Sequence, residues 1–117
     1  MNNLRETWVR KYSHLEKMST SARGNPTLHF EMLASMLELY DKMTKKYRSE
    51  VHELLAEWLV SDNNTHRYDA AFIIRERNIR ILLPAITSAI KHFENSLSPE
   101  ILDEVCDLNK LKNHLEQ

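Results

Sequence analysis

Cysteine and glycine are scarce in this chain of 117 residues. Cys106 is the only cysteine, and Gly24 is the only glycine. A single cysteine cannot form an internal disulfide, which excludes a disulfide scaffold and fits a reducing compartment. A β-rich protein of this length needs more glycine for its turns. The two shortages together favour helices joined by short polar links.

Long apolar runs and a strong charge bias are also missing. No stretch of about 20 apolar residues exists to span a bilayer, and residues 1–12 lack the apolar core of a signal peptide. The net charge of -1 gives no general reason to expect nucleic acid or membrane as a partner. The length is that of one domain. We therefore expect a single cytoplasmic domain, residues 1–117, with no membrane contact.

The apolar residues that are present recur every three or four positions, which is the period of an amphipathic helix. This pattern predicts an all-α fold of about six helices in a compact antiparallel bundle. The expected helices cover residues 4–18, 26–45, 47–60, 66–77, 80–95 and a last segment from residue 99. The predicted buried stripe of the first helix consists of Leu4, Trp8, Val9, Tyr12 and Leu15.

Helix ends are marked by capping residues. Asn25 before Pro26 and Ser98 before Pro99 are expected helix starts, because proline at the first position wastes no N–H group. Asn78 is expected to close a helix in the left-handed conformation. Pro84 fits a helix only within its first turn, where no hydrogen bond is lost.

Residues 49–95 follow the order helix, polar turn, helix, short link, helix. The residues that carry a further pattern within it are Asp62, Arg67, Ala70, Ala71 and Pro84. Their order resembles a HEAT-like repeat. The resemblance implies HEAT-like helix pairs that cross at the two alanines. It also implies a structural role for Arg67, in ion pairs with Asp62 or Asp69.

Motifs for catalysis are missing. His52 and Glu53 begin an apparent zincin motif, but Ala56 stands where the second zinc-binding histidine is required. The histidines form no pair at ligand spacing, no glycine-rich phosphate loop exists, and Cys106 is expected to be a small core residue. We predict that the protein is no enzyme and has no catalytic residue, metal site or cofactor.

Charge is distributed unevenly along the chain. Residues 1–48 have a net charge of +4, and residues 49–117 have a net charge of -5. Four acids of the last predicted helix fall at positions i, i+3, i+4 and i+7, which places them on one face. We call them the acidic row: Glu100, Asp103, Glu104 and Asp107. Glu50, Glu53 and Glu57 form a second stripe. Acidic stripes of this kind either interact favourably with the positive N-terminal ends of helix dipoles or form a surface that binds a basic partner.

Basic residues offer a competing interpretation. The run KMTKKYR, residues 42–48, is the best nucleic-acid candidate, although it also fits a helix end where cations are favoured. Arg75, Arg77 and Arg80 flank a link between helices. Asp69 and Glu76 interrupt that second strip, and phosphate binding rewards uninterrupted positive potential. We therefore disfavour nucleic acid as the partner.

A small, compact helical chain without a catalytic motif resembles the α-helical immunity proteins that bacteria pair with contact-dependent growth-inhibition toxins. The resemblance implies stoichiometric inhibition of one cognate toxin, in which an acidic surface would suit a basic nuclease. The predicted contact consists of Asp69, Glu76 and the acidic row, Glu100, Asp103, Glu104 and Asp107.

Three alternatives remain open at this stage. The chain could be a general protein–protein adaptor or regulator with a HEAT-like surface, or a small enzyme with an unrecognised site. It could also be a nucleic-acid binder that uses the basic run, residues 42–48, together with Arg75, Arg77 and Arg80. A homodimer is compatible with each of them, because several methionines could leave an adaptable apolar patch exposed. These methionines are Met18, Met32, Met36 and Met43.

Overall fold

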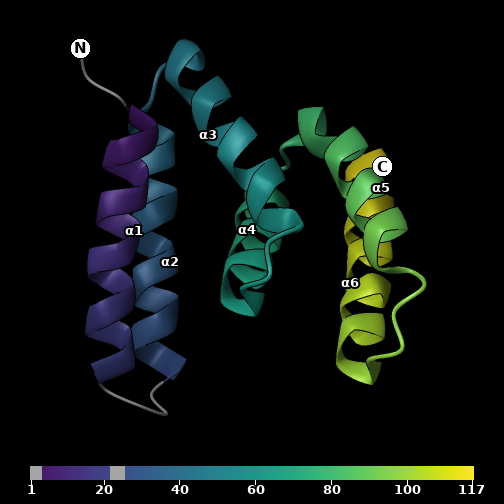
Figure 1. Cartoon of the computed structure of the whole chain (residues 1–117). Helices are drawn as coiled ribbons and strands as arrows, with labels where there is room; N and C mark the ends of the chain where they lie inside the picture. The colour runs from purple at the N-terminus through teal and green to yellow at the C-terminus, as the bar shows by residue number, and fades with distance from the viewer. Residues whose placement is uncertain (1–3, 22–25) are drawn as a thin grey trace. The chain divides into compact units, whose positions relative to one another are not determined.

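The computed structural model describes the backbone of residues 4–21 and 26–117 and the side chains of residues 5–17 and 29–117. This part of the chain contains six α-helices, one 3-10 turn and no strand, which confirms the predicted all-α fold (Figure 1). The elements are α1 (Leu4–Ser21), α2 (Pro26–Lys42), α3 (Lys45–Leu59), α4 (Asn64–Glu76), η1 (Arg80–Leu82), α5 (Leu83–Phe93) and α6 (Pro99–Glu116). The predicted cap Asn25 lies outside the described residues.

The chain divides into two compact units, Met1–Leu54 and Leu55–Gln117. The first unit contains α1, α2 and the beginning of α3. The second unit contains the end of α3 together with α4, η1, α5 and α6. The expectation that residues 1–117 form one domain stays a prediction.

The first unit is built on α1 and α2, which lie side by side as an antiparallel pair (Figure 1). Trp8 and Tyr12, one helical turn apart, are buried as predicted. Val9 was expected on the same stripe, but its side chain is 37% exposed. The expectation is wrong because Val9 lies about 100° around the helix from Trp8.

Methionine fills much of the interior that the described residues enclose. Met32, Met36 and Met43 are all buried. These three methionines therefore contribute nothing to an exposed apolar patch, and the possible homodimer stays a prediction. Their flexible side chains fill irregular core space instead. The side chain of Met18 lies outside the described part.

The link between α2 and α3 is closed by Arg48. Its Nε donates to the Tyr40 carbonyl oxygen at 3.2 Å, and its Nη2 donates to that of Asp41 at 3.1 Å. The guanidinium also lies 4.7 Å from the centroid of the Tyr40 ring, a cation–π contact. These bonds satisfy carbonyl groups that the end of α2 leaves without a helical partner.

In the second unit, polar residues begin and end the helices much as the sequence predicts. The Asn63 side chain caps α4 by accepting from Thr65 N at 2.9 Å and His66 N at 3.2 Å. Asn78 closes α4 with a positive φ of 49°, the left-handed conformation that was predicted. Ser98 caps α6, and its Oγ accepts from Ile101 N at 3.4 Å.

The predicted helix 80–95 differs in its first turn. Residues 80–82 form a 3-10 turn, and the α-helix begins at Leu83, so that Pro84 lies within its first turn. The division follows from proline chemistry. Pro84 has no N–H to donate back toward Arg80, and its ring disfavours a continuous α-helix through the preceding residues.

The core of the second unit is aliphatic. Ile73 and Ile74 of α4 are fully buried, as is Ile86 of α5. The α6 residues Leu108, Leu111 and Leu115 recur at helical spacing and are also buried. Helices α5 and α6 pack against each other, and α4 contacts α6. These contacts place α4 and α6 beside each other as the two walls of a groove.

Two further predictions concern the described helices. None of these helices has the length and apolar character needed to cross a bilayer. The HEAT-like pairing of residues 49–95 stays a prediction. Of its two alanines, Ala70 is fully buried, whereas Ala71 is only half-buried and faces the groove.

Candidate functional site

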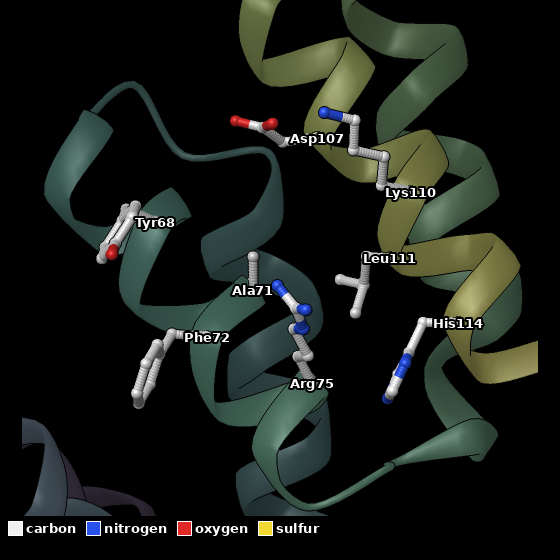
Figure 2. A pocket seen from close by; sticks show the side chains of 8 residues that line it. All are labelled: Tyr68, Ala71, Phe72, Arg75, Asp107, Lys110, Leu111 and His114. Atoms are coloured by element: carbon white, nitrogen blue, oxygen red, sulfur yellow. The ribbon is translucent and has the colours of Figure 1, made fainter.

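A groove between α4 and α6 is a concave feature of the second unit. It consists of two adjoining hollows that share Tyr68, Ala71 and Asp107. The upper hollow has a volume of about 70 Å³, and its other lining residues are Leu59, Arg67, Phe93, Glu104 and Leu108. The lower hollow, of about 340 Å³, is completed by Phe72, Arg75, Lys110, Leu111 and His114 (Figure 2).

Helical spacing explains which side chains reach the groove. On α4, Arg67, Ala71 and Arg75 are four residues apart and therefore share one face. On α6, Glu104, Asp107, Leu108, Leu111 and His114 follow the same three-and-four rhythm. Ala71 is the smallest of these residues, so the groove is open at its position.

An ion pair joins the two walls at the upper end. Arg67 Nε donates to Glu104 Oε1 at 2.9 Å, and Nη2 donates to Oε2 at 3.0 Å, a two-pronged arrangement. Nη1 donates to the Ser61 carbonyl oxygen at 2.7 Å, and the guanidinium lies 5.5 Å from the centroid of Phe93. Arg67 is thereby satisfied within the protein.

This ion pair corrects the partner that was expected for Arg67. Its carboxylate partner is Glu104 on α6, not Asp62 or Asp69. Asp62 is exposed at the elbow that precedes α4. Glu104 is 37 positions away in the sequence, and helical spacing within one segment cannot reveal a neighbour on another helix.

The six acids predicted to contact a partner differ in their burial and in their neighbours. Asp69 is fully buried and cannot contribute to an exposed surface. Its placement follows from its position one turn before Ile73 on the buried face of α4. Glu76 is exposed at the end of α4 but does not line the groove.

The acidic row itself lies along one side of α6. Glu100 and Asp103 are exposed, Glu104 is tied to Arg67, and Asp107 is exposed and lines both hollows. The row thus runs from the start of α6 into the groove. The stripe predicted on α3 is less uniform, because Glu53 and Glu57 are exposed whereas Glu50 is half-buried.

Three basic side chains lie at the lower end, and of these only Arg75 was predicted from the sequence as part of a site, in the nucleic-acid alternative. They are Arg75 from α4 and Lys110 and His114 from α6. His114 Nε2 lies 2.9 Å from Asn78 Oδ1, which holds the ring at the end of α4. A partial signal was present, since Lys110 and His114 are four residues apart and follow Asp107. Their meeting with Arg75 depends on tertiary structure.

The basic run 42–48 divides between two helices. Lys42 ends α2, where a cation is favoured, but Lys45 and Lys46 begin α3, where the helix dipole disfavours them. The expectation that the run marks a favourable helix end is therefore correct for Lys42 and for Arg48, which donates to carbonyl oxygens at the end of α2, but not for Lys45 and Lys46. Arg48 is engaged with Tyr40, whereas Tyr47 is 39% exposed.

His52 lies in the first unit and is hydrogen-bonded to the Tyr40 hydroxyl through Nε2 at 2.9 Å. Burial lowers the pKa of His52 below its ordinary value of 6.5, and the nearby charge of Arg48 lowers that pKa further. The neutral ring is thus favoured. The hydrogen bond joins α2 and α3 within the first unit.

No group of three histidine, cysteine or acidic side chains within the described ranges could hold a metal ion. Cys106 was expected in the core, but it is exposed on α6. It lies on the side of α6 opposite Leu108 and Leu111, about 160° and 140° around the helix from them.

Comparison with known proteins gives no relative for this chain: no family model, no curated protein and no solved structure matches it. Any functional assignment therefore depends on the chemistry of the groove and of the acidic row.

Proposed function

We propose that this chain is a protein-binding module that holds one partner protein through the acidic row and the upper part of the α4/α6 groove. The observation that carries the proposal is the exposure of Glu100, Asp103 and Asp107 on one side of α6. None of the three forms an ion pair with another described residue. Their charge is available to a basic partner.

The energetics of the row support a binding role. Like charges three or four residues apart on a helix repel by about 0.2–0.5 kcal/mol per pair. Glu100, in the first turn of α6, is favoured by the helix dipole, but Asp103 and Asp107 lie beyond the reach of that effect. A basic surface would relieve the repulsion and speed the encounter.

Apolar groups beside the row supply the other element of a protein interface. Tyr68 is 54% exposed on the rim of the groove, and tyrosine is frequent among residues that dominate binding energy. Leu97, which precedes α6, is 97% exposed, and Leu102 is 40% exposed. A partner that covers the row could therefore bury apolar surface as well.

The narrower form of the proposal follows the resemblance to α-helical immunity proteins. In this form the partner is a basic, nuclease-type toxin domain, and the protein binds it one to one and covers its active site. Carboxylates spaced along a helix can occupy the positions that phosphates take on a basic surface. Asp69 is removed from the predicted contact because it is buried.

The test begins with affinity capture of the tagged chain from lysate of its source cells at moderate salt. The affinity of the captured basic protein is then measured for the natural chain and for a variant with Glu100→Lys, Asp103→Lys and Asp107→Lys. We expect the triple variant to bind at least about 100-fold more weakly, which corresponds to about 2.7 kcal/mol. The matched control is Glu94→Lys, which reverses an exposed acid between α5 and α6.

Unchanged affinity of the triple variant would contradict the role of the acidic row. Capture of several unrelated host proteins would favour the adaptor alternative. Retention of RNA or DNA that is lost with salt would favour nucleic-acid binding instead. That last alternative has one observation in its favour, the exposure of Lys45 and Lys46 at the start of α3.

A further inference from the structure

The lower end of the α4/α6 groove has a different character from the acidic row. Arg75, Lys110 and His114 surround a hollow whose apolar lining includes Ala71 and Leu111. The charged residues that line the upper hollow are two acids, Glu104 and Asp107, and one cation, Arg67, whereas two permanent cations, Arg75 and Lys110, and one acid, Asp107, line the lower hollow. The two ends of the groove therefore present opposite charges.

The two permanent cations of this lower end are not engaged elsewhere. Neither Arg75 nor Lys110 forms an ion pair or a side-chain hydrogen bond within the described part of the chain. Arg67, on the same face of α4, is fully engaged with Glu104 and Ser61. The charge of Arg75 and Lys110 thus remains available to an external anion.

The position of His114 adds a third group. Its Nε2 is held by Asn78 Oδ1 at 2.9 Å, and its other ring nitrogen has no described partner. In Figure 2, Arg75 extends from α4 into the space between Ala71 and Leu111, and His114 extends from the facing wall, α6. A hydrogen-bonding anion placed there would be reached from both helices.

The size and lining of the hollow define the ligand. A volume of about 340 Å³ is at the lower end of the range for small-molecule pockets, about 300–1,000 Å³. Ala71 and Leu111 offer an apolar surface next to the cations. Asp107 is the one acid of the lining, and it would repel a second negative charge. These features suit an anion with one charged head and one apolar body.

We propose that the lower hollow binds a small organic monoanion, whose carboxylate is held by Arg75 and Lys110 while its apolar part lies on Ala71 and Leu111. The guanidinium of Arg75 can donate two parallel hydrogen bonds to such a carboxylate. This site goes beyond the proposed protein-binding function. Of the acidic row, only Asp107 lines this hollow.

In the experiment, the full 15N-labelled chain is titrated with sodium 4-phenylbutyrate at constant ionic strength. The chemical shifts of the backbone amides are monitored by NMR. The neutral amide of the same acid is the matched control ligand. We expect saturable shifts for Ala71, Arg75 and residues 110–114. Arg75→Gln should weaken binding about tenfold, as expected for loss of one charge-assisted contact, whereas Asp107→Asn should strengthen it.

Arg77→Gln is the control variant, because Arg77 is exposed at the same end of α4 but does not line the hollow. It should bind the acid as the natural chain does. Circular dichroism of each variant confirms that the helices remain. Both Arg75 and Lys110 are exposed, so their substitution should not prevent folding.

A second arm identifies the source of the carboxylate. A short peptide with blocked ends, one phenylalanine and one glutamate, is titrated in the same way. Tighter binding of the peptide would indicate an acidic side chain of a bound protein, and tighter binding of phenylbutyrate would indicate a free organic acid. Either result supports the site.

The proposal is overturned if the neutral amide binds as well as the acid, or if Arg75→Gln binds as tightly as the natural chain. In that case Arg75 serves only the C-terminal dipole of α4, and Arg75→Gln would lower stability without changing ligand shifts. Such a failure leaves the acidic-row test unaffected, because the deciding variant, Arg75→Gln, lies outside the acidic row and the two experiments use different ligands.

Discussion

Arg67 on α4 and Glu104 on α6 form a two-pronged ion pair, with nitrogen–oxygen distances of 2.9 and 3.0 Å. The side chain of Arg67 is 11% exposed and that of Glu104 is 31% exposed. The pair joins the two walls of the groove at its upper end. It also removes one carboxylate from the acidic row, so that the charge offered to a partner is smaller than the sequence suggests.

Loss of this pair should destabilise the second unit. Glu104→Gln leaves the partly buried guanidinium of Arg67 without its counter-charge, and we expect a loss of about 1–3 kcal/mol in the free energy of unfolding. Urea denaturation, followed by circular dichroism, measures the change. The pair Lys112–Glu116 is the control, because it is at 4.0 Å and more exposed, so Glu116→Gln should cost less than about 0.5 kcal/mol. Equal losses for the two variants would argue against a special role for Arg67.

The stability of the first unit should depend on pH through His52. Because the pKa of His52 is lowered in the folded state, the unfolded chain binds a proton more readily, and acid favours unfolding. The contribution is fully present above the unfolded value of 6.5 and is lost as the pH falls below it toward the folded pKa. Denaturation curves between pH 8 and pH 5 are expected to show a smaller pH dependence for His52→Gln. His92→Gln, at an exposed position, should retain the natural dependence.

Neutralising Asp103 should stabilise the protein while weakening its binding. Asp103→Asn removes repulsion with Glu100 and Asp107, and we expect a gain of about 0.3–1 kcal/mol in the free energy of unfolding. The midpoint of thermal unfolding at low salt provides the measurement. Because salt screens exposed charges, the gain should shrink at high ionic strength. A variant that is less stable at every salt concentration would show that the row is structural rather than reserved for a partner.

A larger side chain in the groove should weaken partner binding with little effect on the stability of the fold. Ala71→Leu places a larger side chain between the two hollows at a half-exposed position, so we expect little loss of stability and a marked loss of partner affinity. Ala70→Leu is the comparison. Ala70 is fully buried, and overpacking there should cost about 1–3 kcal/mol. Unfolding and partner binding are measured for both variants. Normal partner binding by Ala71→Leu would refute the role of the groove.

The left-handed backbone conformation of Asn78 leads to a prediction about how substitutions at the end of α4 change stability. With φ at 49°, Asn78→Gly should be nearly neutral for the backbone, whereas Asn78→Ala should cost about 1–2 kcal/mol. Both variants lose the contact with His114, so the difference between them isolates the backbone effect. Urea denaturation of the two variants side by side measures that difference, and equal stabilities would exclude strain at this position.

Local patterns in the sequence determine the helices and many of their ends. The apolar period, Asn63 before α4, Ser98 before Pro99 and the scarcity of glycine act over only a few residues. Such signals depend on backbone hydrogen bonds and on one helix face at a time. They therefore predict the all-α fold, and they place the acidic row on one side of the last helix.

Contacts between helices were decided by the tertiary structure alone. Arg67 meets Glu104, Arg75 meets the end of α6, and Asp69 lies buried although it carries a charge. In each case the neighbour comes from another segment, and its identity depends on how α4 rotates and packs against the rest of the second unit. A helical period fixes which side chains share a face of one helix. Packing between helices decides whether that face is buried, paired or open to a ligand.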